Sequence, residues 1–202
     1  MTKFAFVVFH LLFGLTSLFG QPAQELILDF SEIDSVQYME YKKDYSNMLI
    51  LDSTKRTIPD SSFTLVVHNK RQQFDCQPDY NPCHYYKGFL SPIQSYVITY
   101  CTLHECGTYL IDQHSGERKE LFSPFDNECE PPLLSKKHNK MLVFASSIFE
   151  TESFISIYQS NDDNGSFNFE SFDSFTTDMW EIYKAICIDE TSFALRIRQE
   201  YI

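Results

Sequence analysis

The apolar residues of this chain come mostly in short alternating runs that are broken by polar turns. A period of two places successive side chains on opposite faces of a strand, whereas an amphipathic helix repeats its apolar residues every three to four positions. The pattern predicts an all-β protein of antiparallel strands, although the segment from Thr177 to Ile188 also fits a short helix. We expect strands over residues 26–30, 36–41, 47–52, 63–68, 84–89, 95–101, 106–112, 117–122, 140–146, 153–159, 167–172, 181–188 and 192–198.

The first twenty residues have the three-part pattern of a secretory signal peptide. Lys3 supplies a positive start, residues 4–19 form an apolar run, and Gly20 is a small residue after which cleavage can occur. The run is shorter than the roughly 20 apolar residues of a membrane-spanning helix, so cleavage is favoured over an uncleaved anchor. We therefore expect residues 1–20 to be a signal peptide, with Ala23 as its alternative end, and residues 21–202 to be a single secreted or periplasmic all-β domain.

The chain is acidic, with a formal net charge of −12. Such a surface repels phosphate groups and anionic lipid heads, so nucleic acids are disfavoured as partners. No second apolar run approaches the length of a membrane span, and we expect none after signal cleavage. The charge is therefore interpreted as keeping an exported domain soluble.

Six cysteines stand in the predicted exported domain, and an even number in an oxidising compartment allows up to three disulfides. They are Cys76, Cys83, Cys101, Cys106, Cys129 and Cys187. Cys101 and Cys106 flank a four-residue loop between two expected strands. If these two face each other, Tyr100 covers Gly107 in the neighbouring strand, which is a sensible cross-strand pair. This spacing predicts a hairpin disulfide, with a redox-active pair or a zinc site as the alternatives.

The second local pair of cysteines encloses a loop with two prolines. Pro78 and Pro82 stiffen the segment between Cys76 and Cys83 and hold it away from strand geometry. A disulfide there would present a rigid knob, which is either a recognition loop or a closed surface loop without a partner. The residues expected to contact a partner are Asp79, Tyr80, His84, Tyr85 and Tyr86. Cys129 and Cys187 then remain; elimination would pair them with each other, but the sequence leaves their pairing open.

Three pairs of expected strands look alike, and matching isoleucines fall at Ile50, Ile111 and Ile157. These isoleucines are 61 and 46 residues apart. Propeller blades repeat at roughly 40–50 residues, so the second spacing fits a blade and the first needs an insertion. The segment from Cys76 to Cys83 is a candidate for that insertion.

The run Tyr109-Leu110-Ile111-Asp112, followed by Ser115-Gly116-Glu117, resembles the inner blade strands of periplasmic propeller-like proteins. In layout, residues 85–198 resemble uncharacterised secreted bacterial proteins with two or three short β-propeller-like blade repeats. The resemblance implies no enzymatic activity. Because propellers close with 4–8 blades, about three units predict an incomplete propeller, as an open or stacked antiparallel meander. A lipocalin-like β-barrel is the alternative, and completion by a partner chain is a further one.

Motifs that carry catalysis are missing from the sequence. It has no G-x-S-x-G, no Gly-rich phosphate loop and no HExxH, and Asn164-Gly165 indicates a hairpin turn rather than a calcium loop. We expect no catalytic, cofactor-binding or metal-binding residues. The expected function is that of an exported binding or structural protein that is not an enzyme, with an unknown protein or glycan partner in the envelope. A small barrel that carries an apolar ligand is the alternative, followed by a secreted hydrolase.

Overall fold

The computed structural model describes residues 3–13, 26–45, 48–52, 62–76, 82–127, 129–147, 152–160 and 167–199. Within these ranges the chain forms fifteen strands, one α-helix and a short 3₁₀ helix at Ser91–Ile93. Each strand pairing in the described residues is antiparallel. The predicted all-β antiparallel class is therefore confirmed.

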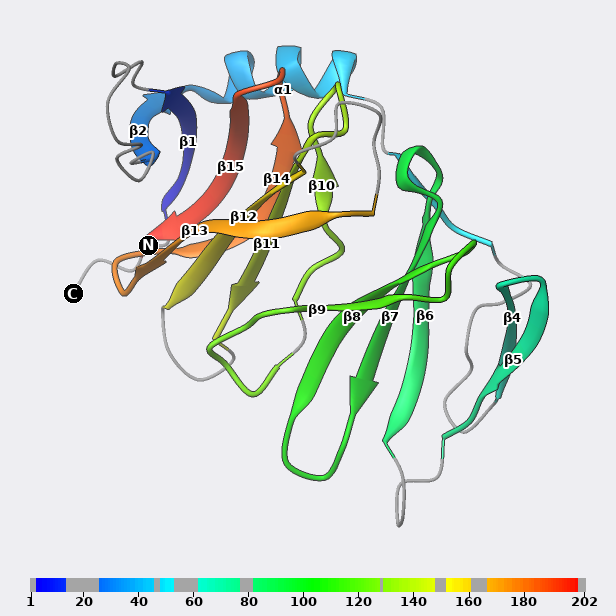
Figure 1. The fold of residues 1–202 in the computed structure, drawn as a ribbon. Helices are drawn as coiled ribbons and strands as arrows, with labels where there is room; N and C mark the ends of the chain where they lie inside the picture. Colours follow the sequence, from blue (N-terminus) through cyan, green and yellow to red (C-terminus); the bar gives the residue numbers. More distant parts are fainter. Residues whose placement is uncertain are drawn as a thin grey trace, which may run out of the picture.

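The strands form three sheets and one separate hairpin (Figure 1). The first sheet has the order β3 (Leu49–Ile50), β6 (Cys83–Leu90), β7 (Ser95–Cys101), β8 (Cys106–Asp112) and β9 (Arg118–Leu121). The second sheet is a meander of β10 (Leu133–Leu134), β11 (Lys140–Ser146), β12 (Ser153–Ser160) and β13 (Phe169–Thr177). The third sheet has the order β14 (Glu181–Cys187), β15 (Ser192–Gln199), β1 (Lys3–Phe13) and β2 (Leu26–Ile33). The hairpin consists of β4 (Phe63–Val67) and β5 (Lys70–Phe74).

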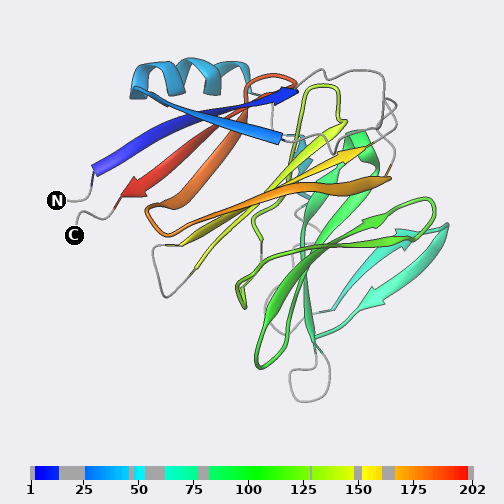
Figure 2. The same cartoon turned by 60° about the vertical axis from the view of Figure 1, so that its left-hand side comes forward.

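These elements stack face to face as five layers: the hairpin, the first sheet, the second sheet, the third sheet and helix α1 (Ser35–Asp44) (Figures 1 and 2). Each neighbouring pair of layers shares its own core cluster. Two residues from each cluster illustrate the order: Leu65 with Ile98, Val97 with Met141, Ile155 with Phe193, and Ala194 with Tyr38. The inner sheets therefore have both faces covered by protein.

This double coverage explains the continuous apolar runs in the inner strands. A strand with one wet face alternates between apolar and polar residues, but one that is covered on both faces does not need to. Lys140–Ala145 of β11 and Ser153–Tyr158 of β12 are buried without a break. The run Met-Leu-Val-Phe-Ala of β11 therefore fills two core clusters at once, one on each side of the second sheet.

The predicted strand over residues 36–41 is wrong, because these residues belong to helix α1. The backbone N–H of Gln37 donates to the carboxylate of Asp34 at 2.8 Å, and the Gln37 side chain accepts from the Asp34 N–H at 3.1 Å. This capping box satisfies two donors that the first helical turn leaves unpaired. The first member of the first expected strand pair is therefore a helix.

Three strands, β1, β5 and β10, are not anticipated by the sequence pattern. The strand β5 reads Lys-Arg-Gln-Gln-Phe and pairs with β4 across a turn at His68 and Asn69. Both turn residues have positive φ, 49° and 58°, as the two-residue turns that suit hairpins require. The hairpin therefore depends on its turn and on its packing, and its second strand shows little apolar alternation.

Residues that the sequence assigns to a signal peptide form β1 in the structure of the whole chain. β1 pairs with β15 from Lys3↔Gln199 to His10↔Ser192, and its other edge pairs with β2. Cleavage of residues 1–20 stays a prediction. It would remove the strand that joins β2 to the rest of the third sheet.

No sheet of the described residues closes into a barrel, because each has two edge strands. The fold is therefore a stack of open sheets, and the lipocalin-like alternative does not describe it. The relation to propeller blades stays a prediction. The Asn164-Gly165 turn lies outside the described residues, although β12 and β13, which flank it, pair antiparallel. No helix among the described residues combines the length and the apolar character that a membrane crossing requires.

Candidate functional site

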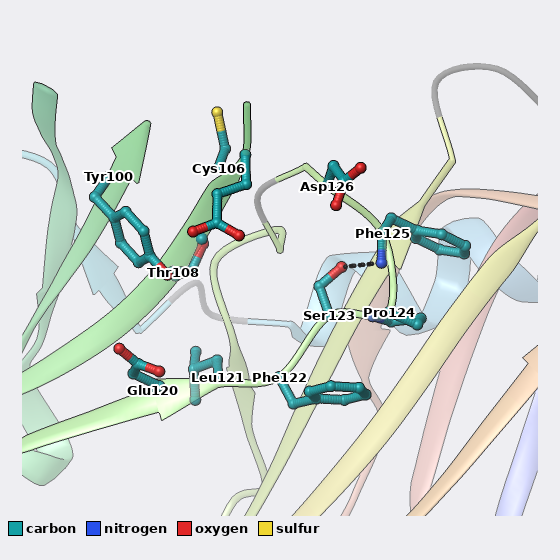
Figure 3. Close-up of a pocket in the computed structure, with 12 residues that line it drawn as sticks. Tyr100, Cys106, Thr108, Glu120, Leu121, Phe122, Ser123, Pro124, Phe125 and Asp126 are labelled. Atoms are coloured by element: carbon teal, nitrogen blue, oxygen red, sulfur yellow. Dashed lines mark hydrogen bonds between the residues drawn. The ribbon is translucent and has the colours of Figure 1, made fainter. Parts of the chain in front are cut away.

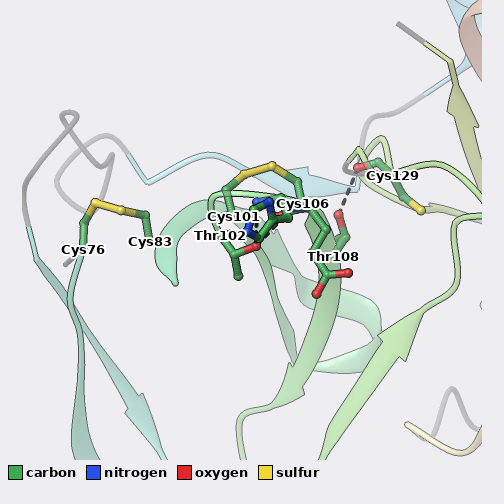
Figure 4. The surroundings of a disulfide bond; sticks show 9 residues. Cys76, Cys83, Cys101, Thr102, Cys106, Thr108 and Cys129 are labelled. Carbon is green, nitrogen blue, oxygen red and sulfur yellow. Dashed lines mark hydrogen bonds between the residues drawn. A yellow bond between two sulfur atoms is a disulfide. The ribbon is translucent and has the colours of Figure 1, made fainter. Parts of the chain in front are cut away.

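Two disulfides lie side by side at one end of the first sheet (Figure 4). Cys83 on β6 is directly opposite Cys101 on β7, and Cys101 is directly opposite Cys106 on β8. Cys83 is bonded to Cys76, which follows β5, and Cys101 is bonded to Cys106. Both predicted local disulfides are confirmed. We call this end of β6, β7 and β8, which carries the two bonds, the disulfide end.

The predicted bond between Cys129 and Cys187 is wrong. Cys129 is 2% exposed and lies in the core between the first and second sheets, whereas Cys187 is 4% exposed between the second and third sheets. The second sheet thus separates the two thiols. The Cys129 thiol donates to the carbonyl of Phe122 at 3.5 Å, and the Cys187 thiol donates to that of Asp189 at 3.0 Å. Burial raises the pKa of the Cys187 thiol to about 11, so it stays protonated at neutral pH.

The register at the disulfide end follows the sequence prediction. Tyr100 is opposite Gly107, and its ring covers the glycine so closely that an added Cβ would lie 2.6 Å from ring atoms. The connecting loop is fixed by Thr102, whose hydroxyl accepts from the backbone N–H groups of His104 and Glu105 at 3.2 and 3.1 Å. Glycine is therefore the one residue type at position 107 that leaves room for the Tyr100 ring on this face of the sheet.

A groove of about 400 Å³ opens between the hairpin and the disulfide end. We call it the hairpin groove; it is lined by Gln72, Gln73, Phe74, Asp75, Pro82, His84 and Arg118. Asp75 and Arg118 are its charged residues, of opposite sign. The amide of Gln73 donates to the Asp75 carboxylate at 2.8 Å, which leaves oxygens of both groups able to accept further bonds. The groove thus offers donors and acceptors with little net charge.

His84 stands between two aromatic rings at the base of the hairpin groove. Its ring centroid is 5.7 Å from that of Phe74 and 6.2 Å from that of Tyr109. Burial lowers the pKa of His84, although the Asp75 carbonyl, 3.4 Å from Nδ1, favours the charged form. The imidazole is therefore neutral at pH 7, when it offers one donor and one acceptor.

Tyr109 is a buried polar residue beneath the same groove. Its side chain is packed between His84 and the guanidinium of Arg118, which lies 5.4 Å from the ring centroid. Burial raises the pKa of Tyr109 to about 12, and its hydroxyl has no hydrogen-bond partner within the described residues. A buried hydroxyl without a hydrogen-bond partner costs free energy.

A second cavity, of about 240 Å³, lies where β9 ends (Figure 3). We call it the β9 cavity; its walls include Tyr100, the carboxylates of Glu105, Glu120 and Asp126, and the segment 121–125. The backbone N–H of Cys106 donates to the Asp126 carbonyl at 3.0 Å, which anchors this segment to the disulfide end. Burial raises the pKa of Tyr100, and the charges of Glu120 and Glu105 raise it further. The β9 cavity is therefore acidic.

The hairpin groove and the β9 cavity are joined by a line of rings on one face of the first sheet. Phe74, His84, Tyr109 and Tyr100 follow one another with centroid separations of 5.7, 6.2 and 6.0 Å. We call this line the aromatic row. Tyr100 and His84 are half-buried, whereas Phe74 and Tyr109 are buried. The row therefore has a half-buried ring at each depression, and the buried rings of Phe74 and Tyr109 pack against them.

The residues expected to contact a partner do not gather on one face. His84 lines the hairpin groove, but Tyr85 comes opposite Thr99 and, by strand alternation, faces the other side of the sheet. Tyr86 is 8% exposed and packs against Phe63 in the core. Asp79 and Tyr80 lie outside the described residues. The structure adds four residues that the sequence did not indicate as a site: Gln72, Gln73, Tyr100 and Arg118.

No group of three or more His, Cys, Asp or Glu side chains in the described ranges is placed to hold a metal ion. The chain matches no protein-family model, no curated protein and no solved structure.

Proposed function

We propose that the protein is an exported binding protein, not an enzyme, and that it holds a glycan at the disulfide end of the first sheet. The aromatic row carries this proposal, because it joins two depressions that are rich in hydrogen-bonding side chains. The two adjacent disulfides restrain the strands and the loop that present the row. A surface that is already ordered pays little conformational entropy when it binds.

Export is supported by two independent features. Disulfides persist in oxidising compartments, and two are present among the described cysteines. The first twenty residues also have the charge and apolar pattern of a secretory signal. We propose that the protein works in the periplasm or the extracellular space.

The side chains at the disulfide end suit a ligand that is rich in hydroxyl groups. Amide, carboxylate and guanidinium groups present paired donors and acceptors, as in Gln72, Asp75 and Arg118. Tyr100 and His84 offer apolar ring surface beside them, on which the C–H faces of a sugar can pack. A glycan residue with its alternating polar and apolar faces fits this mixture.

The charge of the site selects among glycans. The carboxylates of Asp75, Glu105, Glu120 and Asp126 outnumber the guanidinium of Arg118. The chain as a whole carries a formal net charge of −12. Both features repel an acidic polysaccharide, so the proposed ligand is a neutral glycan.

Co-sedimentation of the exported protein with insoluble polysaccharides tests this proposal. Neutral, amino-sugar and acidic polymers are compared at one salt concentration, with the disulfides intact. We expect retention on a neutral polymer, and a loss of about 3- to 10-fold in affinity for Tyr100→Ala, the effect of removing one aromatic contact. Tyr183→Ala is the matched control, because Tyr183 is a 40% exposed tyrosine on β14 of the third sheet.

Two results would contradict the proposal. Equal retention of the wild type and Tyr100→Ala would remove the aromatic row from the binding site. Retention on no polymer, together with capture of a specific protein from the host's envelope fraction, would replace the glycan by a protein partner.

The loop between Cys76 and Cys83 is tested separately. Residues 77–81 lie outside the described ranges, but Asp75 and Pro82, near the two ends of this loop, line the hairpin groove. If it forms part of the contact surface, Tyr80→Ala leaves the fold intact and weakens capture. Unchanged capture by this variant would exclude the loop.

A further inference from the structure

The third sheet holds β1 between β15 and β2, and β1 is the only strand that β2 pairs with among the described residues. The register is continuous across all three strands. Phe9 is opposite both Phe193 and Phe30, and Val8 is opposite both Ala194 and Ser31. Loss of β1 would therefore leave two strands without a partner on facing edges.

The backbone groups along the edge of β15 that faces β1 are too deeply buried to be left unpaired. Phe193, Ala194 and Leu195 are each 0% exposed, and the strand has the second sheet on one face and helix α1 on the other. Backbone N–H and C=O groups that are buried without hydrogen-bond partners cost free energy. An unpaired edge along β15 is therefore strongly disfavoured, and a strand has to cover it.

The segment 26–33 is placed to do so. It runs parallel to β15, because each of the two is antiparallel to β1. A sideways move by one strand spacing, about 4.8 Å, would bring Phe30 level with Phe193 and Ser31 level with Ala194 without any shift along the strand. A mixed sheet with one parallel edge pair is an ordinary arrangement.

We propose that removal of residues 1–20 causes a strand exchange in which residues 26–33 take the place of β1 and pair in parallel with β15. The inference rests on the export that is part of the proposed function. After this exchange the third sheet of the exported protein has the strand order β14-β15-β2.

The chain's own segment is favoured over a strand from another molecule, because it is tethered beside the vacant edge. Ile33 packs in the same cluster as Ala194 and Tyr38, and helix α1 begins at Ser35. The helix covers the same face of the third sheet before and after the exchange. This tether gives the segment a high effective concentration at β15, which a second copy of the chain does not have.

Cysteine cross-linking distinguishes the two arrangements. In the full chain residues 31 and 194 are two strand spacings apart, about 10 Å, which exceeds the reach of about 7 Å between the Cα atoms of a disulfide. After the exchange they are one spacing apart. We expect Ser31→Cys with Ala194→Cys to form an intramolecular bond on oxidation of chain 21–202 and none in chain 1–202. The control is Val8→Cys with Ala194→Cys in chain 1–202, where the two positions are directly opposite.

The wild-type chain 21–202 provides a second measurement that needs no substitution. If the exchange occurs, the protein is a monomer by light scattering, and the amides of residues 193–197 are protected from hydrogen exchange. A dimer with the cross-link between two chains would assign the edge to a second copy. Rapid exchange at residues 193–197, or an exported protein whose mass still includes residues 1–20, would each overturn the inference. None of these readouts involves the first sheet, so a failure of glycan binding is recognised independently.

Discussion

The ring of Tyr100 on β7 lies directly over the backbone of Gly107 on β8, and an added methyl group at Gly107 would approach ring atoms to 2.6 Å. The atoms that would be hit are at the outer end of the tyrosine side chain, so the ring can swing away. Gly107 therefore determines the position of the half-buried Tyr100 ring more than it determines the stability of the protein.

Gly107→Ala separates these two roles. We expect the free energy of unfolding to fall by less than about 1 kcal/mol, because the ring moves and the backbone does not have to. Affinity for the neutral polysaccharide should fall as it does for Tyr100→Ala, since the displaced ring no longer covers the sheet face. Urea unfolding and co-sedimentation measure the two effects. Full binding by Gly107→Ala would show that the position of the ring does not matter.

Gly88 on β6 provides the contrasting case. Its φ is +152°, a conformation that side chains with a Cβ rarely adopt, and an added Cβ would lie 2.7 Å from Leu49. It stands at a register shift between β6 and β7, which is typical of a bulge. We expect Gly88→Ala to lower the free energy of unfolding by about 1–3 kcal/mol. A urea midpoint that matches the wild type would contradict this explanation of the bulge.

The thiol count tests the separation of Cys129 from Cys187. The native, unreduced protein should not react with a thiol reagent at pH 8, because both thiols are buried and the pKa of Cys187 is raised to about 11. In denaturant without reductant, two thiols per chain should react. After reduction, the count should rise to six. No reactive thiol in the unreduced, denatured protein would mean that these two cysteines are oxidised after all.

The stability of the protein should depend on pH through His84. Burial holds the pKa of His84 in the folded chain below its ordinary value of about 6.5. Between these two pKa values the unfolded chain binds the proton more readily, so stability falls as the pH decreases from about 6.5 through the lowered pKa. At higher pH the residue is neutral in both states and the effect disappears.

Substitution identifies the contribution of this residue. His84→Asn should reduce the slope of unfolding free energy against pH in that window. His104→Asn, which removes another histidine from the exposed loop between β7 and β8, is the matched control. Equal slopes for the wild type and His84→Asn, measured by urea unfolding at several pH values, would assign the dependence to other groups.

The predictions from the sequence were most accurate for the ranges and the register of strands that are neighbours in the chain and pair with each other. The ranges of β8 and β11 coincide with the predicted strands 106–112 and 140–146. The cross-strand position of Tyr100 over Gly107 followed from the short loop that Cys101 and Cys106 enclose. A short loop fixes the register of its two strands, and the register decides which side chains share a face.

The predictions of strands were wrong where a local signal, such as a helix cap or a turn, mattered more than the alternation of apolar and polar residues. Val36 and Met39 are exposed on helix α1, at 64% and 50%, so the alternation there did not report burial. The capping box of Asp34 and Gln37 was the contrary signal, with the spacing that begins a helix. The polar strand β5 lacked alternation, and only its two-residue turn could have indicated it.

The candidate site could not be predicted, because packing between distant segments creates it. Gln72 and Arg118 line one groove but belong to the hairpin and to β9, which are not neighbours in the chain. Pairing Cys129 with Cys187 by elimination failed for a similar reason. The sequence does not show that a whole sheet lies between them.

The position of the third sheet has a consequence for the order of folding. The first and second sheets take β6–β9 and β10–β13 from consecutive stretches, whereas the third pairs Lys3 with Gln199. Contacts of such high sequence separation carry the greatest loop-closure entropy and slow folding. The first two sheets can therefore assemble earlier during synthesis, while the third waits for β15. Pairing of residues 26–33 with β15 would impose the same delay, so the third sheet forms after the first two in either arrangement.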